Sequence, residues 1–322
     1  RMSFVRTVLG DINPSDLGVT YAHEHVILDA PIVEDRFPHI LLDDASVAVE
    51  ELAACADAGV GAMVDAMPCG VGRDAVRLAA ISEATGLNVV ATTGLHTRKW
   101  YPGLCWANEL APEQLAELFI ADIEEGIDRF DYRGPYVERT RHRAGIVKIG
   151  TMQEEPNERD RRVFAAAAIT HRATGVPILT HCEEGRGGLE QVELLRQLGV
   201  DPQAVVLSHT DKVDDYDYHL ALAATGAYVE YDQALRHRIS EESTTVRMAA
   251  TLVAAGFGRQ VMLGTDGARR SLWSGYGGRP GLVALMRDVV PVLTRAGLSD
   301  EEISHIMVHN PASFLAFGEV VS

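Results

Sequence analysis

The run Gly145-Ile146-Val147-Lys148-Ile149-Gly150-Thr151 is followed by a helical pattern over Glu158–Ala173 and by a second apolar run over Pro177–Cys182. Short runs rich in β-branched residues predict strands, and the longer amphipathic segment between them predicts a helix. Two strands joined by a helix form a βαβ unit, in which the strands are parallel. This segment therefore predicts an α/β fold.

The same unit recurs along the chain on both sides of this segment. No linker rich in Pro, Gly and Ser separates the repeats. Glycines follow the expected helices, at the C′ position where helices commonly end. The expected strands are Thr20–Leu28, Ala62–Pro68, Asn88–Gly94, Gly145–Thr151, Pro177–Cys182, Ala204–Thr210, Ala227–Asp232 and Gln260–Asp266. The expected helices are Ser46–Ala58, Arg73–Thr85, Pro112–Ile127, Glu158–Ala173, Leu189–Leu198, Asp214–Ala224, Ser243–Ala255 and Leu282–Ala296.

Eight such repeats favour one closed barrel over a doubly wound sheet that is split into two domains. We therefore predict a single domain over residues 1–322, a (β/α)8 TIM barrel. A C-terminal helical extension is expected over Ser299–Leu315, with a break at Asn310-Pro311 because proline disrupts a helix interior. In this fold, polar residues at the carboxyl ends of the strands form the active site.

The composition excludes several classes of protein. The 322 residues are 47% hydrophobic and carry 46 acidic against 29 basic side chains, for a net charge of -17. This balance argues against nucleic acid as a partner, because binding to phosphates depends on Lys and Arg. No apolar run is long enough for a membrane span and no secretory signal is present, so we expect a soluble, cytoplasmic protein. The four cysteines form no CxxC motif and are expected to be reduced.

Polar residues that suit metal binding lie at the ends of several expected strands. Each has an ordinary structural explanation when taken alone: a histidine pair can be hydrogen-bonded, and an aspartate can cap a helix. Together they place four imidazoles, an amine and a carboxylate at one face of the barrel, and imidazole with carboxylate is a ligand set for Zn, Mn, Fe or Co. The six residues are His23, His25, Lys148, His181, His209 and Asp266.

Lys148 is the most informative of the six, because it lies within an apolar strand. A buried ammonium beside divalent cations is costly, so we expect the amine to be deprotonated. A neutral amine can react with carbon dioxide to form a carbamate, whose two oxygens can bridge two metal ions. A pair of metal ions lowers the pKa of water and polarises a carbonyl or phosphoryl oxygen, so the expected chemistry is hydrolysis.

The ordered set His23-x-His25, Lys148, His181, His209 and Asp266 resembles the phosphotriesterase family of the amidohydrolase superfamily. The similarity extends from Gly10-Asp11-Ile12 and Tyr21-Ala22-His23-Glu24-His25 to His309-Asn310-Pro311-Ala312, which is nearly the whole chain.

The resemblance implies a role for each residue of the set. His23, His25 and Asp266 would bind one metal ion, and His181 and His209 would bind a second. Lys148 would be an N6-carboxylysine that bridges the two ions, and Asp266 would also be catalytic, moving the proton when a bridging hydroxide attacks. Zinc is the expected metal, with Mn, Co or Fe as alternatives, and barrels of this family commonly form homodimers.

Two loops bear on the substrate. The short eighth loop, Asp266–Trp273, resembles that of the sugar-lactonase branch, in which Arg269 would match a phosphate-binding position and Arg238 a basic partner. Leu272 departs from this branch, because a tyrosine is expected there. In the third loop, His96 falls where related lactonases present a tyrosine near the metals. The alternative, that His96 is simply an exposed loop residue, is equally well supported. Tyr101 would either line the pocket or pack the loop.

We therefore predict a metal-dependent hydrolase of ester bonds, a lactonase that opens a sugar or other small lactone. The alternatives are a phosphotriesterase, an acyl-homoserine lactonase or an amide hydrolase, each of which uses the same metal pair. A binding protein that has kept the barrel without turnover is less favoured, because every ligand position is intact.

Overall fold

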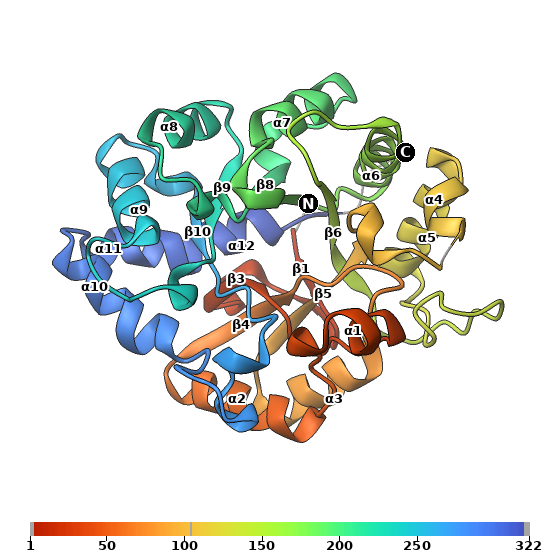
Figure 1. Cartoon of the computed structure of the whole chain (residues 1–322), viewed down its shortest axis with the longest axis horizontal. Helices are drawn as coiled ribbons and strands as arrows, with labels where there is room; N and C mark the ends of the chain where they lie inside the picture. Colours follow the sequence, from red (N-terminus) through yellow and green to blue (C-terminus); the bar gives the residue numbers. More distant parts are fainter. Residues whose placement is uncertain (1–2, 104, 319–322) are drawn as a thin grey trace.

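The computed structural model describes residues 3–103 and 105–318. Eight parallel strands form its central sheet, in the order β3 to β10, and helices surround them (Figure 1). The predicted (β/α)8 barrel is thereby confirmed, and each expected strand is present. Their bounds are β3 Val19–Glu24, β4 Val60–Asp65, β5 Asn88–Gly94, β6 Ala144–Thr151, β7 Ile178–Cys182, β8 Val205–Ser208, β9 Tyr228–Tyr231 and β10 Val261–Leu263.

Backbone hydrogen bonds close the barrel between its first and last strands. The amides of Thr265 and Asp266, just beyond β10, both donate to the carbonyl oxygen of His23 in β3, at 3.1 and 3.0 Å. Gly264 permits this approach, since a Cβ there would lie 2.7 Å from the His23 backbone nitrogen. The Glu24 carboxylate adds two bonds from Thr265, so the ends of β10 and β3 are fixed together.

The helices that follow the strands pack on the outside of the barrel, and glycine ends several of them. Gly86 and Gly175 have φ values of 72° and 77°, the left-handed conformation that glycine adopts without strain. The helices are α1 Pro31–Arg36, α2 Ala45–Asp57, α3 Ala75–Thr85, α4 Cys105–Glu109, α5 Pro112–Glu124, α6 Glu158–Thr174, α7 Gly188–Gln197, α8 Tyr216–Ala224, α9 Thr244–Ala254, α10 Val290–Arg295, α11 Asp300–Ser304 and α12 Asn310–Leu315.

The two ends of the chain cover the amino-terminal end of the barrel, which seals the face opposite the strand ends. An N-terminal hairpin, which the sequence did not predict, lies there. Its two antiparallel strands are β1 Val5–Thr7 and β2 Gly10–Ile12. Phe4 and Phe317 exchange two backbone hydrogen bonds, and Phe314 packs with Val5 in the core beneath the strands.

The predicted C-terminal extension is helical, but the break expected at Asn310-Pro311 is wrong. A π-helical segment, His305–His309, continues directly into α12, and Pro311 lies in the first turn of that helix. Proline has no N–H to donate, and it is tolerated in the first turn of a helix, where that donor is not needed. The wider π turn just before Pro311 changes the hydrogen-bonding pattern, so the helix continues without this N–H. Among the described residues, no helix combines the length and the apolar character needed to cross a bilayer.

Candidate metal centre

The six predicted residues converge at the carboxyl-terminal face of the barrel. They come from the ends of β3, β6, β7, β8 and β10, and five of them line one cavity of about 340 Å³. His23 lies beneath this cavity and is fully buried. The lining members are His25, Lys148, His181, His209 and Asp266.

His23, His25 and Asp266 form one cluster that could hold a metal ion, with ligand atoms within 4.8 Å of one another. His25 Nε2 lies 3.4 Å from Asp266 Oδ1. Asp266 has a φ of 45°, which is strained for a residue with a side chain. The bonds that fix Thr265 to β3 hold the backbone in this conformation, which turns the carboxylate towards the histidines.

His181 and His209 form a second cluster, in which each imidazole has a carboxylate partner at one ring nitrogen. His209 Nδ1 donates to Asp232 Oδ1 at 2.9 Å, and His181 Nε2 donates to Glu183 Oε2 at 2.6 Å. Burial lowers the pKa of both imidazoles, so each carries a single proton. The free nitrogens, His181 Nδ1 and His209 Nε2, then face each other at 2.9 Å as two lone pairs.

Two lone pairs at this distance repel each other unless a cation lies against both of them. The donor set around them consists of neutral imidazoles and carboxylates, which is the chemistry that divalent transition metals prefer. The residues present therefore fit a metal site, with Asp266 nearby, since its Oδ2 lies 3.8 Å from His209 Nδ1. A further combination of His23, His209 and Asp232 also brings its ligand atoms within 4.8 Å.

Lys148 lies beside the first cluster and lines the same cavity as the second. Its Nζ is 3.4 Å from His23 Nε2, and the side chain is fully buried in β6. Burial lowers the pKa of the amine to about 8, although the carboxylates of Asp266 and Glu230 oppose this effect. A minor fraction of the amine is therefore neutral near neutral pH, far more than for an ordinary lysine, and the neutral amine is the form that carbamate formation requires.

Carboxylates behind the histidines are the residues that the sequence reading missed. Glu230 Oε1 lies 3.0 Å from His23 Nδ1, and Asp232 contacts His209; both acids are fully buried on or next to β9. Glu183 follows His181 by two residues. A signal for them was present, because Glu230 interrupts an otherwise apolar strand, and a buried acid normally requires a partner.

The two arginines expected to bind substrate are placed differently. Arg269 is exposed and lines the cavity as expected, whereas Arg238 is exposed and is not among the lining residues. Arg236 takes the inner position instead, since the turn Ala234–Arg236 directs its Nη2 to Asp266 Oδ2 at 2.6 Å. Two lysines, Lys99 and Lys212, complete the basic rim.

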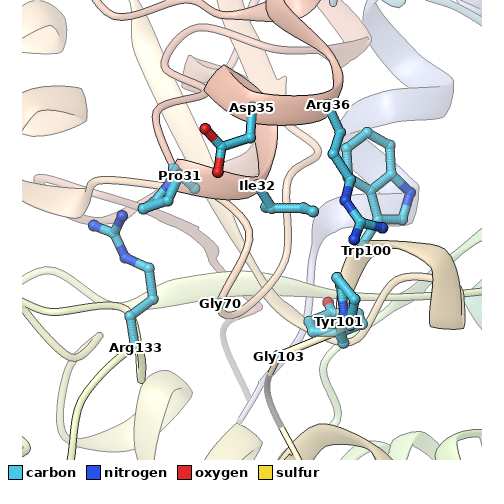
Figure 2. Close-up of a pocket in the computed structure, with 11 residues that line it drawn as sticks. Pro31, Ile32, Asp35, Arg36, Gly70, Trp100, Tyr101, Gly103 and Arg133 are labelled. Carbon is cyan, nitrogen blue, oxygen red and sulfur yellow. The ribbon is translucent and has the colours of Figure 1, made fainter.

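His96 lines the cavity with its ring 4.6 Å from that of His181, and its Nδ1 accepts from the Thr97 amide. Tyr101 does not line this cavity. Its hydroxyl donates to the Cys69 carbonyl and accepts from the His96 amide, so it packs the third loop. The Tyr101 ring borders a neighbouring cavity of about 450 Å³, shown in Figure 2, and Trp100 lies in the wall of both cavities.

A (β/α)8 barrel that gathers histidines and carboxylates around a cavity at its carboxyl-terminal face defines the class of metal-dependent barrel hydrolases. Residues 3–315 match the profile of the Phosphotriesterase family. The chain belongs to this family, which confirms the resemblance found in the sequence and the prediction of a hydrolase.

Similar proteins cover nearly the full length of the chain. The chain is 34% identical to a phospho-furanose lactonase of Mycoplasmopsis synoviae, over 98% of this chain and 92% of that protein. It is 28% identical to an aryldialkylphosphatase of Saccharolobus solfataricus, over 95% and 97% of the two chains. A lactonase structure from Listeria monocytogenes superposes with a TM-score of 0.89 at 29% identity, covering 98% of this chain and all of the other.

Proposed function

We propose that this protein is a lactonase with two divalent metal ions, and that its substrate is a small sugar lactone bearing an anionic group. The observation that carries this proposal is the cavity itself. Its floor presents unprotonated imidazole nitrogens and Asp266, and its rim presents Arg269, Lys212 and Lys99. Similarity to phospho-furanose lactonases supports the same class of substrate.

In this proposal His23, His25 and Asp266 bind one ion, and His181 and His209 bind the other. Lys148, as a carbamate, would supply oxygen ligands to both ions, and its place beside His23 in the wall of the same cavity supports this role. When bound, the two ions would polarise the lactone carbonyl and lower the pKa of the attacking water. Zinc is the metal we propose, because it accepts imidazole and carboxylate ligands in variable coordination number.

Asp266 is the residue that moves the proton in this proposal. Burial raises its pKa, but the Arg236 guanidinium and His209 outweigh burial and hold the pKa well below its usual range. The carboxylate is therefore ionised at neutral pH and can accept the proton of the attacking water. The same oxygen would then return the proton to the ring oxygen that leaves as the lactone opens.

The basic rim orients the substrate. Arg269 lies at the cavity mouth and makes no side-chain ion pair with any residue that the structure describes, and Lys212 extends from the loop after β8. Leu272 is buried in the core and is not among the cavity residues, so a phosphate would be held by Arg269 and Lys212 without a tyrosine. Arginine and lysine both bind phosphate or carboxylate groups.

A panel of lactones tests this proposal. The zinc-loaded chain would be assayed on phosphorylated, carboxylated and neutral sugar lactones, on an acyl-homoserine lactone and on an aryl phosphotriester. We expect the highest kcat/KM for a phosphorylated or carboxylated sugar lactone, and slow turnover of the triester by the same site. Faster hydrolysis of the triester than of every lactone would instead assign the chain as a phosphotriesterase.

We also propose a cytoplasmic location and a homodimeric state. Cys55, Cys69 and Cys182 are buried free thiols, and free thiols are typical of proteins that act in a reducing compartment. Light scattering on the purified chain would test the dimer, and fractionation of the source cells would test the location.

A further inference from the structure

Three of the four candidate ligand imidazoles, His23, His181 and His209, have a carboxylate beside one ring nitrogen. Two of these carboxylates, Glu230 and Asp232, are fully buried beneath the histidines. Glu183 differs from both, since it lies in the cavity wall and its side chain is 21% exposed. The third carboxylate is therefore the one that a bound substrate and the surrounding loops can reach.

We propose that Glu183 is a positioning residue, which orients His181 and sets the nitrogen that carries its proton. Glu183 Oε2 accepts the His181 Nε2 proton at 2.6 Å, so Nδ1 is left as the acceptor that faces His209. Without this bond the proton could occupy Nδ1, where it would block binding of a cation. This inference rests on the metal site of the proposed function.

The local fold places Glu183 over His181. β7 ends at Cys182, and a single turn, Glu183–Gly185, reverses the chain directly after it. Glu184 has a φ of 52°, and a Cβ at Gly185 would lie 2.7 Å from the His209 carbonyl oxygen. The turn is thus packed against the end of β8, which leaves the Glu183 carboxylate little freedom to move away from His181.

A second loop holds the same carboxylate. Lys99, which follows β5, lies 3.3 and 3.4 Å from the two oxygens of Glu183. The Lys99 ammonium also lies 5.8 Å from the centre of the Trp100 ring, and this cation–π contact helps to hold it beside Glu183. The hydrogen bonds from His181 and Lys99 together hold both oxygens of the Glu183 carboxylate.

The competing interpretation is that Glu183 contacts the substrate, because it lines the cavity. The two roles differ in what they change. A positioning residue changes the affinity for the metal ion that His181 binds, whereas a substrate contact changes KM and leaves metal affinity unaltered. Measurement of zinc binding therefore separates the two roles without depending on turnover.

The test uses the full chain with Zn²⁺ as the probe and compares Glu183→Ala, Glu183→Gln and Glu184→Ala. Glu184 is the matched control, since it lies in the same turn but is exposed to solvent. Zinc affinity would be measured by competition with a chelating dye, and bound zinc by elemental analysis. For Glu183→Ala we expect the site that includes His181 to lose roughly 10- to 100-fold in affinity, as for other partners of metal-binding histidines.

Glu183→Gln should lose less than Glu183→Ala, because the amide oxygen can still accept from His181 Nε2, and Glu184→Ala should match the wild type. Thermal unfolding of each metal-free variant verifies that the barrel is folded. Zinc affinity unchanged in Glu183→Ala, or weakened equally in Glu184→Ala, would overturn the inference. A wild-type chain that binds zinc but opens no lactone would refute the proposed substrate class alone, and one that binds no zinc would refute both proposals.

Discussion

Arg269→Met removes the free guanidinium at the mouth of the cavity and keeps a side chain of similar length. Arg269 lines the cavity that holds the candidate metal ligands, and it makes no side-chain ion pair among the described residues. Its neighbour Arg270 instead pairs with Asp43 at 3.1 Å and lies 3.9 Å from the centre of the Tyr276 ring. Two consecutive arginines therefore differ in orientation, which provides a control of the same residue type.

The structure sets the magnitude of the expected effect. A hydrogen bond that involves charged groups contributes about 1.5–3 kcal/mol. Arg269 is exposed, so water screens its charge and the lower end of this range applies. Because about 1.4 kcal/mol corresponds to a tenfold change in rate, we expect kcat/KM for a phosphorylated sugar lactone to fall roughly tenfold in Arg269→Met.

The assay compares a phosphorylated lactone with the same lactone lacking phosphate, in wild type, Arg269→Met and Arg270→Met. The loss should be seen mainly in KM, because the phosphate does not react and its contact is the same in the ground and transition states. The neutral lactone should be affected less than twofold. Added salt should narrow the difference between wild type and Arg269→Met.

An equal loss on both lactones would refute this reasoning, because it would mean that Arg269 supports the site and does not recognise the anion. An equal loss in Arg270→Met would refute it as well. A loss confined to kcat on the phosphorylated substrate would place Arg269 nearer to the reacting atoms than the cavity geometry indicates.

Three other predictions concern the metal site and the barrel. Lys148→Ala should reduce bound metal to below about one ion per chain by elemental analysis, and added short carboxylic acids should partly restore activity; unchanged metal content without them would exclude the bridge. In the metal-free protein, burial raises the pKa of Glu24 to about 8 and of Asp211 to about 7, so the folded state retains protons that the unfolded chain has released. The free energy of unfolding should therefore fall by about 1 kcal/mol per pH unit between pH 6.5 and 8 in denaturant titrations, and a flat profile would contradict this. Asn310→Ala should lower the free energy of unfolding by about 1–3 kcal/mol, because the buried Asn310 amide donates to the carbonyls of Gly258 and Val261. A decrease below about 0.5 kcal/mol, which is typical of a surface substitution, would show that these bonds are dispensable.

The barrel and the convergence of the six candidate residues could be predicted because both depend on local patterns. Apolar runs such as Gly145–Thr151 have few alternatives to a buried parallel strand, and strand ends in a barrel meet at one face. The N-terminal hairpin could not be predicted in this way, since strands of three residues carry almost no periodicity. The uninterrupted helix across Asn310-Pro311 depends on a π turn, which no sequence pattern indicated.

The substrate residues were harder to predict because loop geometry determines them. Arg236 and Arg238 are two residues apart, and only the conformation of the turn Ala234–Arg236 selects the first for the cavity. Tyr101 is adjacent to Trp100, yet only Trp100 lies in the wall of the cavity. Alternation along a strand predicts the direction of a side chain, and a short 3-10 turn does not provide that regularity.

The acidity of the chain and the basic rim of its cavity can be understood together. The net charge is -17, but Asp232 is buried beneath His209, where it accepts the Nδ1 proton of that imidazole. Arg269 and Lys212 lie at the mouth, on the side that a substrate approaches. The negative charge of Asp232 therefore lies behind the candidate ligands, where it would favour a bound cation, while positive charge faces the solvent. An anionic substrate would therefore meet the positive charge at the cavity mouth first. Low-dielectric walls concentrate the field within a cavity, so the local potential matters more to the substrate than the net charge of the chain.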